Sequence, residues 1–285
     1  MTHNILLVGR SCNEGLEGLF IEAFKALGNK ILCLGYQELL PIKNNLLKLL
    51  TRQSLVRNTY IRELIISTSS ALKKYNEHIL TLADKYDIDI IFIIKGEAVS
   101  IETIKLLATE FANSALIYLN PDDPRYVRTL SYIYMLHEFT IYTPCKKCMH
   151  FMRKFSNKVY HLPFAVSHQK LLYPRTPDKR GKFILLIGSL YPNRLRIIKK
   201  ILKKFGKKVP VAVAGPFWNY VFLRKKYQGI YGKKYANITN LALITLNIHH
   251  TNDIGFKANM RLYEIPGMGG FEITDNYDIV KEYYD

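Results

Sequence analysis

The chain has 285 residues, 48% of them hydrophobic, and carries 41 Lys and Arg against 23 Asp and Glu, for a formal charge of +18. This length and apolar content exclude a disordered protein and predict two domains of ordinary size. The cationic surplus indicates anionic partners, and nucleotide phosphates, anionic lipid surfaces and nucleic acids all fit that description.

The amino-terminal sequence, Met-Thr-His, leads directly into an apolar segment without a basic leader or a cleavage site, so we expect a cytoplasmic protein. Four cysteines are too few for a disulfide framework in a chain of this size. Cys145 and Cys148 form a C-x-x-C sequence with His150 nearby. Because no second pair lies at zinc-ribbon spacing, incidental thiols are favoured over half a zinc site or a redox pair.

The first half of the chain alternates between apolar strands and amphipathic helices. Residues 4–9 predict a strand, 16–27 a helix ended by Gly28, and 30–34 a second strand, which makes a βαβ opening. The loop 9–15 lacks the G-x-G-x-x-G spacing of dinucleotide binding. We therefore expect no nicotinamide or flavin cofactor.

Residues 46–86 predict one or two helices rich in Leu, Ile and Lys. A core-facing helix with solvated lysines is the preferred interpretation, and docking of its basic face on an anionic membrane is the alternative. A strand over 88–94 follows, and it is too short to cross a bilayer. Ser100 is expected to cap the next helix, and 115–119 is the next strand.

Asp122 and Asp123 follow that strand within the sequence Asn-Pro-Asp-Asp-Pro. Two adjacent carboxylates can bind a hard cation, orient an acceptor hydroxyl or act as a general base. The alternative is a proline-bounded turn in which Asp is a usual residue, and chemistry alone favours it.

A segment rich in proline and charge, 163–182, predicts a linker, so we expect one domain over 1–165 and a second over 166–285. The second domain restarts with a strand over 183–188 and continues with a basic helix over 194–205. Further strands over 209–214 and 241–248 complete a second alternating pattern. The sequence thus predicts an α/β protein with two Rossmann-like domains.

The segment 255–275 combines several glycines with polar side chains that could bind a ligand, namely Asn259, Arg261 and Glu264. A short helix starting near Lys257, after a buried strand, would open at the carboxyl end of a parallel sheet, where anions bind. Lys257 and Arg261 add charge for a diphosphate. Pro266 makes this helix short or kinked.

Glu264 lies three residues after Arg261, so on a helix both side chains point to one side. A carboxylate there can accept two hydrogen bonds from vicinal hydroxyls such as those of a ribose. On spacing alone, solvated helix residues at Asn259, Arg261 and Glu264 are an equally good interpretation.

The sequence of residues 259–275, Asn-Met-Arg-Leu-Tyr-Glu-Ile-Pro-Gly-Met-Gly-Gly-Phe-Glu-Ile-Thr-Asp, resembles the signature of the CgeB-like (spore maturation protein type) glycosyltransferases, a branch of the GT-B nucleotide-sugar enzymes. Five further segments resemble blocks of that family in the same order: 122–124, 161–165, 187–194, 215–218 and 246–249. The resemblance implies a GT-B-like fold, in which two Rossmann-like domains face each other across a cleft. It also implies sugar transfer from a nucleoside-diphosphate sugar to a glycan, protein or lipid acceptor that the sequence does not name.

The resemblance implies roles for single residues. Arg194, Lys199 and Arg261 would bind the donor diphosphate and Glu264 the ribose, so no metal is required. The expected donor-binding residues are Gly188, Arg194, Lys199, Tyr231, His249, Asn259, Arg261 and Glu264. Tyr231 would stack on the nucleobase or pack as an ordinary tyrosine, and His249 would contact ligand or be a satisfied core histidine. Asp122 and Asp123 become catalytic candidates on the acceptor side.

Two departures from the family keep other interpretations open. Many GT-B relatives have two glutamates separated by seven residues; the second corresponds to Glu264, but the first would fall on Phe256. Whether the anomeric centre of the sugar is retained or inverted therefore stays open. The second departure is that the sequence stops at Asp285, so we expect a short carboxyl-terminal part. An inactive donor-binding relative is one alternative.

A basic protein that binds nucleic acid or an anionic membrane is the other alternative. Contact with a membrane is kept as an expectation, whereas a nucleic acid partner is not expected, because the lysines are dispersed over both halves of the sequence.

Overall fold

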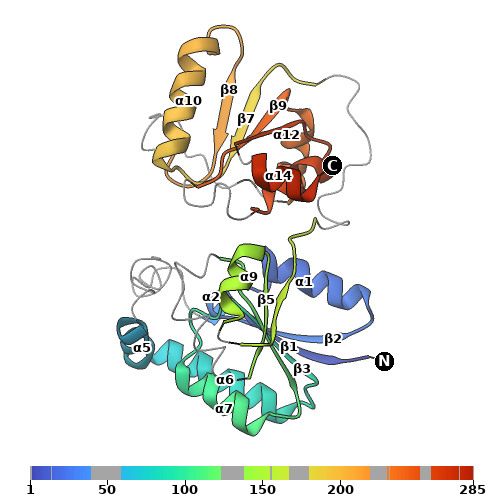
Figure 1. Cartoon of the computed structure of the whole chain (residues 1–285). Coiled ribbons are helices and arrows are strands. Elements are labelled where there is room, and N and C mark those ends of the chain that lie inside the picture. The colour runs from blue at the N-terminus through green and yellow to red at the C-terminus, as the bar shows by residue number, and fades with distance from the viewer. Residues whose placement is uncertain are drawn as a thin grey trace. The chain divides into compact units, whose positions relative to one another are not determined.

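A computed structural model of the chain describes residues 2–13, 15–39, 59–122, 138–154, 156–166, 180–218, 230, 232–250, 258–275 and 277–284. The chain divides into two compact units, unit 1 (Met1–Pro163) and unit 2 (Phe164–Asp285). Each is a parallel sheet flanked by helices (Figure 1). The expected α/β class with two Rossmann-like domains is confirmed.

Unit 1 contains a six-stranded sheet in the order β2-β1-β3-β4-β5-β6, and every pair of neighbours is parallel. Its strands are β1 (Asn4–Gly9), β2 (Lys30–Gly35), β3 (Ile90–Ile94), β4 (Ala115–Leu119), β5 (Thr140–Thr143) and β6 (Val159–His161). Its helices are α1 (Gly15–Ala26), α2 (Tyr36–Leu39), α5 (Thr59–Thr68), α6 (Ser70–Lys85), α7 (Ile101–Glu110) and α9 (Lys146–Met152). Strand order reverses beside β1, so the edge after β1 and β3 is the switch point at which open α/β sheets bind ligands.

Alternate residues of β1 point to opposite faces of this sheet and meet different helices. Leu6 and Val8 pack in one apolar cluster with residues of α6 and α7, whereas Ile5 and Leu7 pack in another with Phe20 and Phe24 of α1. Both faces are therefore covered, which explains why the strands are continuous apolar runs.

Two local expectations for unit 1 are settled by the structure. Ser100 caps α7, because its Oγ accepts a hydrogen bond from the Thr103 N–H at 3.0 Å. The region 46–86 is helical from Thr59, as α5 and α6, while 46–58 lies outside the described residues.

The expectation that the cysteines are incidental thiols is wrong: Cys12 is joined to Cys33 and Cys145 to Cys148 as disulfides. Cys12 follows β1 and Cys33 lies in the neighbouring strand β2, so their Cα atoms are 5.8 Å apart. Cys145 is the N-cap of α9, and the first turn of that helix brings the Cα of Cys148 within 5.1 Å. Both bonds lie in unit 1.

Unit 2 contains a four-stranded parallel sheet in the order β10-β9-β7-β8. Its strands are β7 (Ile184–Ile187), β8 (Val211–Ala214), β9 (Ile244–Asn247) and β10 (Glu272–Thr274). Its helices are α10 (Pro192–Phe205), α12 (Gly232–Leu241), α13 (Arg261–Gly267) and α14 (Tyr277–Tyr283). Strand order reverses beside β7, so the switch point of this sheet lies where β7 and β9 end.

The unit 2 core also has two sides. Ile184 and Leu186 of β7 pack in the cluster that contains Ile198 of α10 and Trp218, whereas Ile187 packs with Tyr235 of α12. Figure 1 shows α10 on one side of this sheet and α12 and α14 on the other. Among the residues that the structure describes, no helix has the length and apolar character needed to span a membrane.

Candidate functional site

The candidate site lies at the carboxyl edge of the unit 2 sheet, at its switch point. β7 and β9 are neighbouring parallel strands, so Gly188, which follows β7, and His249, which follows β9 by two residues, lie at the same edge. We call the group formed by Gly188, Arg194, His249, Arg261 and Glu264 the β7–β9 site.

Gly188 is the point on which two guanidinium groups converge. Its φ is 147°, a value that side-chain-bearing residues rarely adopt. A Cβ at this position would overlap Nη1 of Arg261 and lie 2.9 Å from Nη1 of Arg194. The Gly188 carbonyl accepts a hydrogen bond from the Trp218 indole N–H at 2.7 Å. A glycine here therefore lets both cations approach the backbone.

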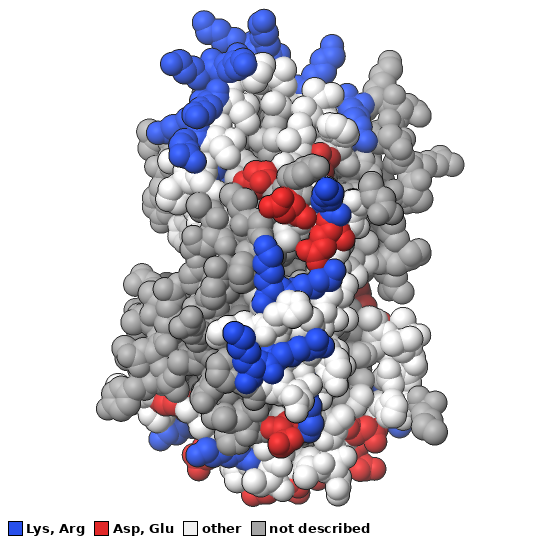
Figure 2. Space-filling model, in the orientation of Figure 1, with Lys and Arg blue, Asp and Glu red and all other residues white. Residues whose placement is uncertain are grey.

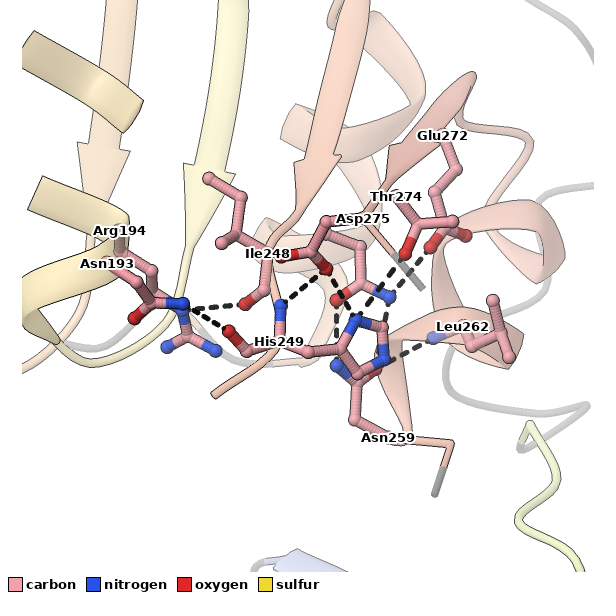
Figure 3. Close-up of polar contacts among 10 residues, drawn as sticks. Asn193, Arg194, Ile248, His249, Asn259, Leu262, Glu272, Thr274 and Asp275 are labelled. Carbon is pink, nitrogen blue, oxygen red and sulfur yellow. Dashed lines mark hydrogen bonds and ion pairs between the residues drawn. The ribbon is translucent and has the colours of Figure 1, made fainter. Parts of the chain in front are cut away.

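Arg194, the third residue of α10, is held almost completely inside the protein, with 3% of its surface exposed. Its Nε donates to the Ile248 carbonyl and its Nη1 to the Ser189 carbonyl, both at 2.8 Å. Asn193 beside it donates to the His249 carbonyl at 2.7 Å. Figure 3 shows Asn193 and Arg194 reaching from α10 toward the segment after β9. The first turn of α10 is thus fastened to the chain that follows β9.

His249 is fully buried and is paired with Asp275 (Figure 3). One carboxylate oxygen, Oδ1 of Asp275, lies 2.9 Å from both the backbone N and the ring Nδ1 of His249. Burial would raise the pKa of Asp275, but these two hydrogen bonds from His249 outweigh burial and lower it. The other ring nitrogen, Nε2, is buried without a hydrogen-bond partner among the described residues.

Asn259 faces the interior of unit 2. Its amide exchanges hydrogen bonds with the amide of Asn247, at 3.1 and 2.8 Å, and its Oδ1 accepts the Leu262 N–H at 3.1 Å. Asn247 also donates to Glu272 Oε1 at 2.7 Å. These bonds fix the start of α13 against β9 and β10.

Arg261 and two glutamates form the charged part of the site. Arg261 donates from Nη1 to the Ile187 carbonyl. Burial raises the pKa of Glu264, while the charge of Arg261 and a 3.4 Å hydrogen bond from the Tyr235 hydroxyl oppose the rise. Burial likewise raises the pKa of Glu272 to about 7, against the Asn247 hydrogen bond and the charge of Arg261. Part of the carboxylate charge is therefore suppressed near neutral pH.

The remaining predicted site residues lie apart from this group or outside the described chain. Lys199 is exposed on α10, five residues after Arg194. Asp123, Tyr231, Phe256 and Lys257 lie outside the described residues.

Asp122 belongs to unit 1, where its Oδ2 lies 3.0 Å from Lys95 Nζ at the edge that follows β3 and β4. The pair is about one-third exposed, at 38% for Lys95 and 35% for Asp122. Attraction to Asp122 raises the pKa of Lys95, so the ammonium stays charged.

Sequence reasoning missed the residues that hold the site in place. These residues are Asn247, in the predicted strand 241–248, and Glu272 and Asp275, in the segment 255–275. The sequence patterns predict no contact for any of them. Their periodicity identifies strands, but only the pairing of β9 with β10 brings residues 247 and 249 beside 272 and 275. The signal available in sequence was the acidic or amide character of all three positions at strand ends.

Among the described ranges of the chain, no three His, Cys, Asp or Glu side chains are grouped so that they could hold a metal ion.

Comparisons with known proteins give a family match for part of unit 2 and a fold match for the chain. A family model described as "Glycosyl transferase-like" matches residues 194–285. No curated protein sequence matches significantly.

Two solved structures share the fold. The DNA-modifying enzyme β-glucosyltransferase, described with its substrate uridine diphosphoglucose, matches with a TM-score of 0.51 and 11% identity over 98% of this chain and 82% of that one. The N-terminal domain of trehalose-6-phosphate phosphatase from Candida albicans matches with a TM-score of 0.54 and 14% identity over 94% of this chain and 80% of that one.

Proposed function

We propose that this protein is a glycosyltransferase, which transfers a sugar from a nucleoside-diphosphate sugar to an acceptor. The observation that carries the proposal is the glycosyltransferase-like family match over residues 194–285, because that range contains every member of the β7–β9 site except Gly188. The match of the whole fold to a glucosyltransferase supports it.

In this proposal, Arg194 and Arg261 bind the donor diphosphate above Gly188. A guanidinium has five N–H donors, and the hydrogen bond described above uses one of those of Arg261. Because both cations are already fixed by backbone carbonyls, little reorganisation is needed when negative charge develops on the departing diphosphate. Lys199 would add charge from the exposed side of α10.

Glu264 would bind the ribose hydroxyls, and His249 would present Nε2 to the donor. The Tyr235 hydroxyl beside Glu264 fixes one carboxylate oxygen and leaves the other for a ligand. The Asp275 carboxylate favours the His249 tautomer with hydrogen on Nδ1, which makes Nε2 an acceptor for a sugar hydroxyl. Asn259 would act by fixing the start of α13.

We propose that unit 1 binds the acceptor, with Asp122 or Asp123 orienting or deprotonating the attacking hydroxyl. The Lys95 ammonium keeps a positive charge and lies 3.0 Å from Asp122 Oδ2, so it would hold this side chain in place beside an acceptor hydroxyl.

The narrower assignment that we propose is the CgeB-like branch, acting without a metal in the cytoplasm and in part at a membrane surface. The resemblance of residues 259–275 supports the branch, and the two arginines, which supply charge that a metal would otherwise provide, support metal independence.

The test is thermal unfolding with a panel of nucleoside diphosphates and their sugars, on the wild-type protein, Arg261→Ala and Glu264→Ala. A ligand at a hundred times its dissociation constant adds about 2.7 kcal/mol of stability. One nucleotide should raise the melting temperature of the wild type, and both substitutions should remove the rise. Arg196→Ala, at an exposed position on α10, is the matched control and should keep it.

The outcomes are distinct. If no nucleotide shifts the melting temperature of folded wild-type protein, the donor site is refuted. Donor binding without hydrolysis or transfer to any acceptor would instead identify an inactive relative. If the rise in melting temperature persists in Arg261→Ala, the donor does not bind beside Gly188.

A further inference from the structure

The net positive charge of this protein is concentrated in unit 2. That unit has 21 Lys and Arg against 8 Asp and Glu, whereas unit 1 has 20 against 15. Within unit 2, residues 179–252 contain 16 Lys and Arg and not one Asp or Glu. The cations are thus dispersed over both halves of the chain, as expected, and the difference in net charge arises because unit 2 has fewer acidic residues.

Seven of these cations form one exposed surface on α10 and the turn after it, which we call the α10 basic face. Its members are Arg196, Lys199, Lys200, Lys203, Lys204, Lys207 and Lys208, and all are exposed. The opposite side of α10 carries Ile198, Ile201 and Leu202 into the core. Figure 2 shows a dense group of Lys and Arg over α10 with no acidic side chain among them.

One aromatic ring stands among these cations. Phe205, the last residue of α10, is 42% exposed, and the Lys204 ammonium lies 5.4 Å from the centre of its ring. A large apolar ring bordered by lysines is suited to a surface that is charged outside and apolar beneath, because the ring can enter it while the ammonium groups stay at the headgroups.

We propose that the α10 basic face binds an anionic lipid bilayer. Clusters of four to eight Lys or Arg on an amphipathic helix are typical of surfaces that bind acidic lipids. Six of the seven cations are lysines, which act as point charges and require no particular geometry of phosphate. Nucleic acid surfaces favour arginine, which grips phosphates and bases with two hydrogen bonds, and interleave several aromatic rings.

This inference is independent of the proposed sugar transfer. It uses charge, exposure and one ring on the outer side of α10, whereas the β7–β9 site uses the buried first turn of that helix. A protein with no donor affinity could still bind lipid through this surface.

The test is co-sedimentation of the full chain with phosphatidylcholine vesicles that contain or lack 30% phosphatidylglycerol, at low and at high salt. A cation near such a surface strengthens binding about fivefold. The variant Lys203→Gln/Lys204→Gln/Lys207→Gln/Lys208→Gln, which avoids Lys199, should therefore partition at least about a hundredfold more weakly. Phe205→Ala should lower partition about tenfold and leave the salt dependence unchanged.

The matched control removes four exposed lysines from unit 1, as Lys73→Gln/Lys74→Gln/Lys85→Gln/Lys105→Gln. These residues lie on α6 and α7, so the variant loses the same charge and also tests the alternative that the helical region 46–86 docks on membranes. It should keep most of the wild-type partition. Circular dichroism of both variants establishes that they are folded.

Three results would overturn the proposal. The first is equal partition into vesicles with and without phosphatidylglycerol. The second is an equal or larger loss in the unit 1 control. The third is tight, salt-dependent binding of a DNA or RNA duplex through the same four lysines with no lipid binding, which would identify a nucleic acid surface.

Discussion

The two units place opposite charges at the same point of the same fold. In each, the first strand of the unit is followed by a loop and then a helix, and the third residue of that helix is buried and ionisable. In α1 this residue is Glu17, 5% exposed, which accepts a 2.7 Å hydrogen bond from the Arg10 N–H. In α10 it is Arg194, 3% exposed, which donates to two carbonyls.

This difference decides which unit is suited to a diphosphate. A carboxyl group buried beside the loop after β1 repels an anion when it is charged, and burial raises the pKa of Glu17. A guanidinium in the matching place attracts one and cannot lose its proton. A shared fold therefore leaves function to single residues at its switch point.

The largest effect should come from removing the two ionisable groups of this comparison. Arg194→Met leaves the Ile248 and Ser189 carbonyls without their donor and should lower the free energy of unfolding by about 4 kcal/mol. Glu17→Gln keeps an acceptor for Arg10 and should cost less than about 1 kcal/mol. Urea denaturation measures both, and exposed Arg196→Met is the control with no expected change. Equal costs for Arg194→Met and Glu17→Gln would contradict the comparison.

Gly188→Ala should have the next largest effect on the free energy of unfolding, and it should destabilise unit 2 alone. The new methyl group meets two guanidinium groups at a φ that alanine rarely adopts, for a cost of about 3 kcal/mol. In unit 1, Gly28 has a φ of 80° but nothing within 4 Å of an added Cβ, so Gly28→Ala isolates the backbone term at about 1 kcal/mol. Hydrogen exchange of peptides from each unit localises the two effects. Similar costs for both would mean that the guanidinium contacts are unimportant.

Glu272→Gln should change the pH dependence of stability. The pKa of Glu272 is raised to about 7 by burial, so the stability that its protonated form contributes is complete below about pH 4 and is lost as pH rises through 7. Between pH 5 and pH 8 the variant should gain about 1 kcal/mol relative to the wild type, a figure reduced for partial exposure. Exposed Glu77→Gln is the control. If the difference in unfolding free energy between Glu272→Gln and the wild type is constant from pH 5 to pH 8, Glu272 is charged over that whole range.

The smallest effect should come from the exposed pair at the edge of unit 1. Lys95→Met removes the ion pair with Asp122 and should cost less than about 1 kcal/mol, because both side chains are about one-third exposed. High salt should erase the difference, and exposed Lys105→Met on α7 should show none. A loss of several kcal/mol would mean that the edges of the two units are equally rigid.

Much of this fold could be predicted from sequence because apolar runs and caps are local signals. The strands at 4–9 and 115–119 were predicted with the observed bounds, and Ser100 caps the expected helix. Strand β5 was missed because Thr140–Thr143 has only four residues and a mixed composition. The Cys12–Cys33 pairing was missed because it depends on which strands are neighbours.

The candidate site divides in the same way. Gly188 and Arg261 were identified from their own chemistry and from a family resemblance, and the structure brings them together. The partnership of His249 with Asp275 could not be predicted, because 26 residues separate them and only the pairing of β9 with β10 closes that distance. Contacts between strand ends follow from topology, which no local pattern contains.

The indole of Trp218 offers an optical view of the β7–β9 site. Trp218 is the only tryptophan of the chain, is fully buried, and donates to the carbonyl of the glycine on which both arginines converge. Its emission therefore reports one environment, and a ligand that shifts the Gly188 peptide would change that emission without any label. Donor titrations could accordingly be followed by intrinsic fluorescence in the unmodified protein, with the many tyrosines excluded by excitation at the red edge.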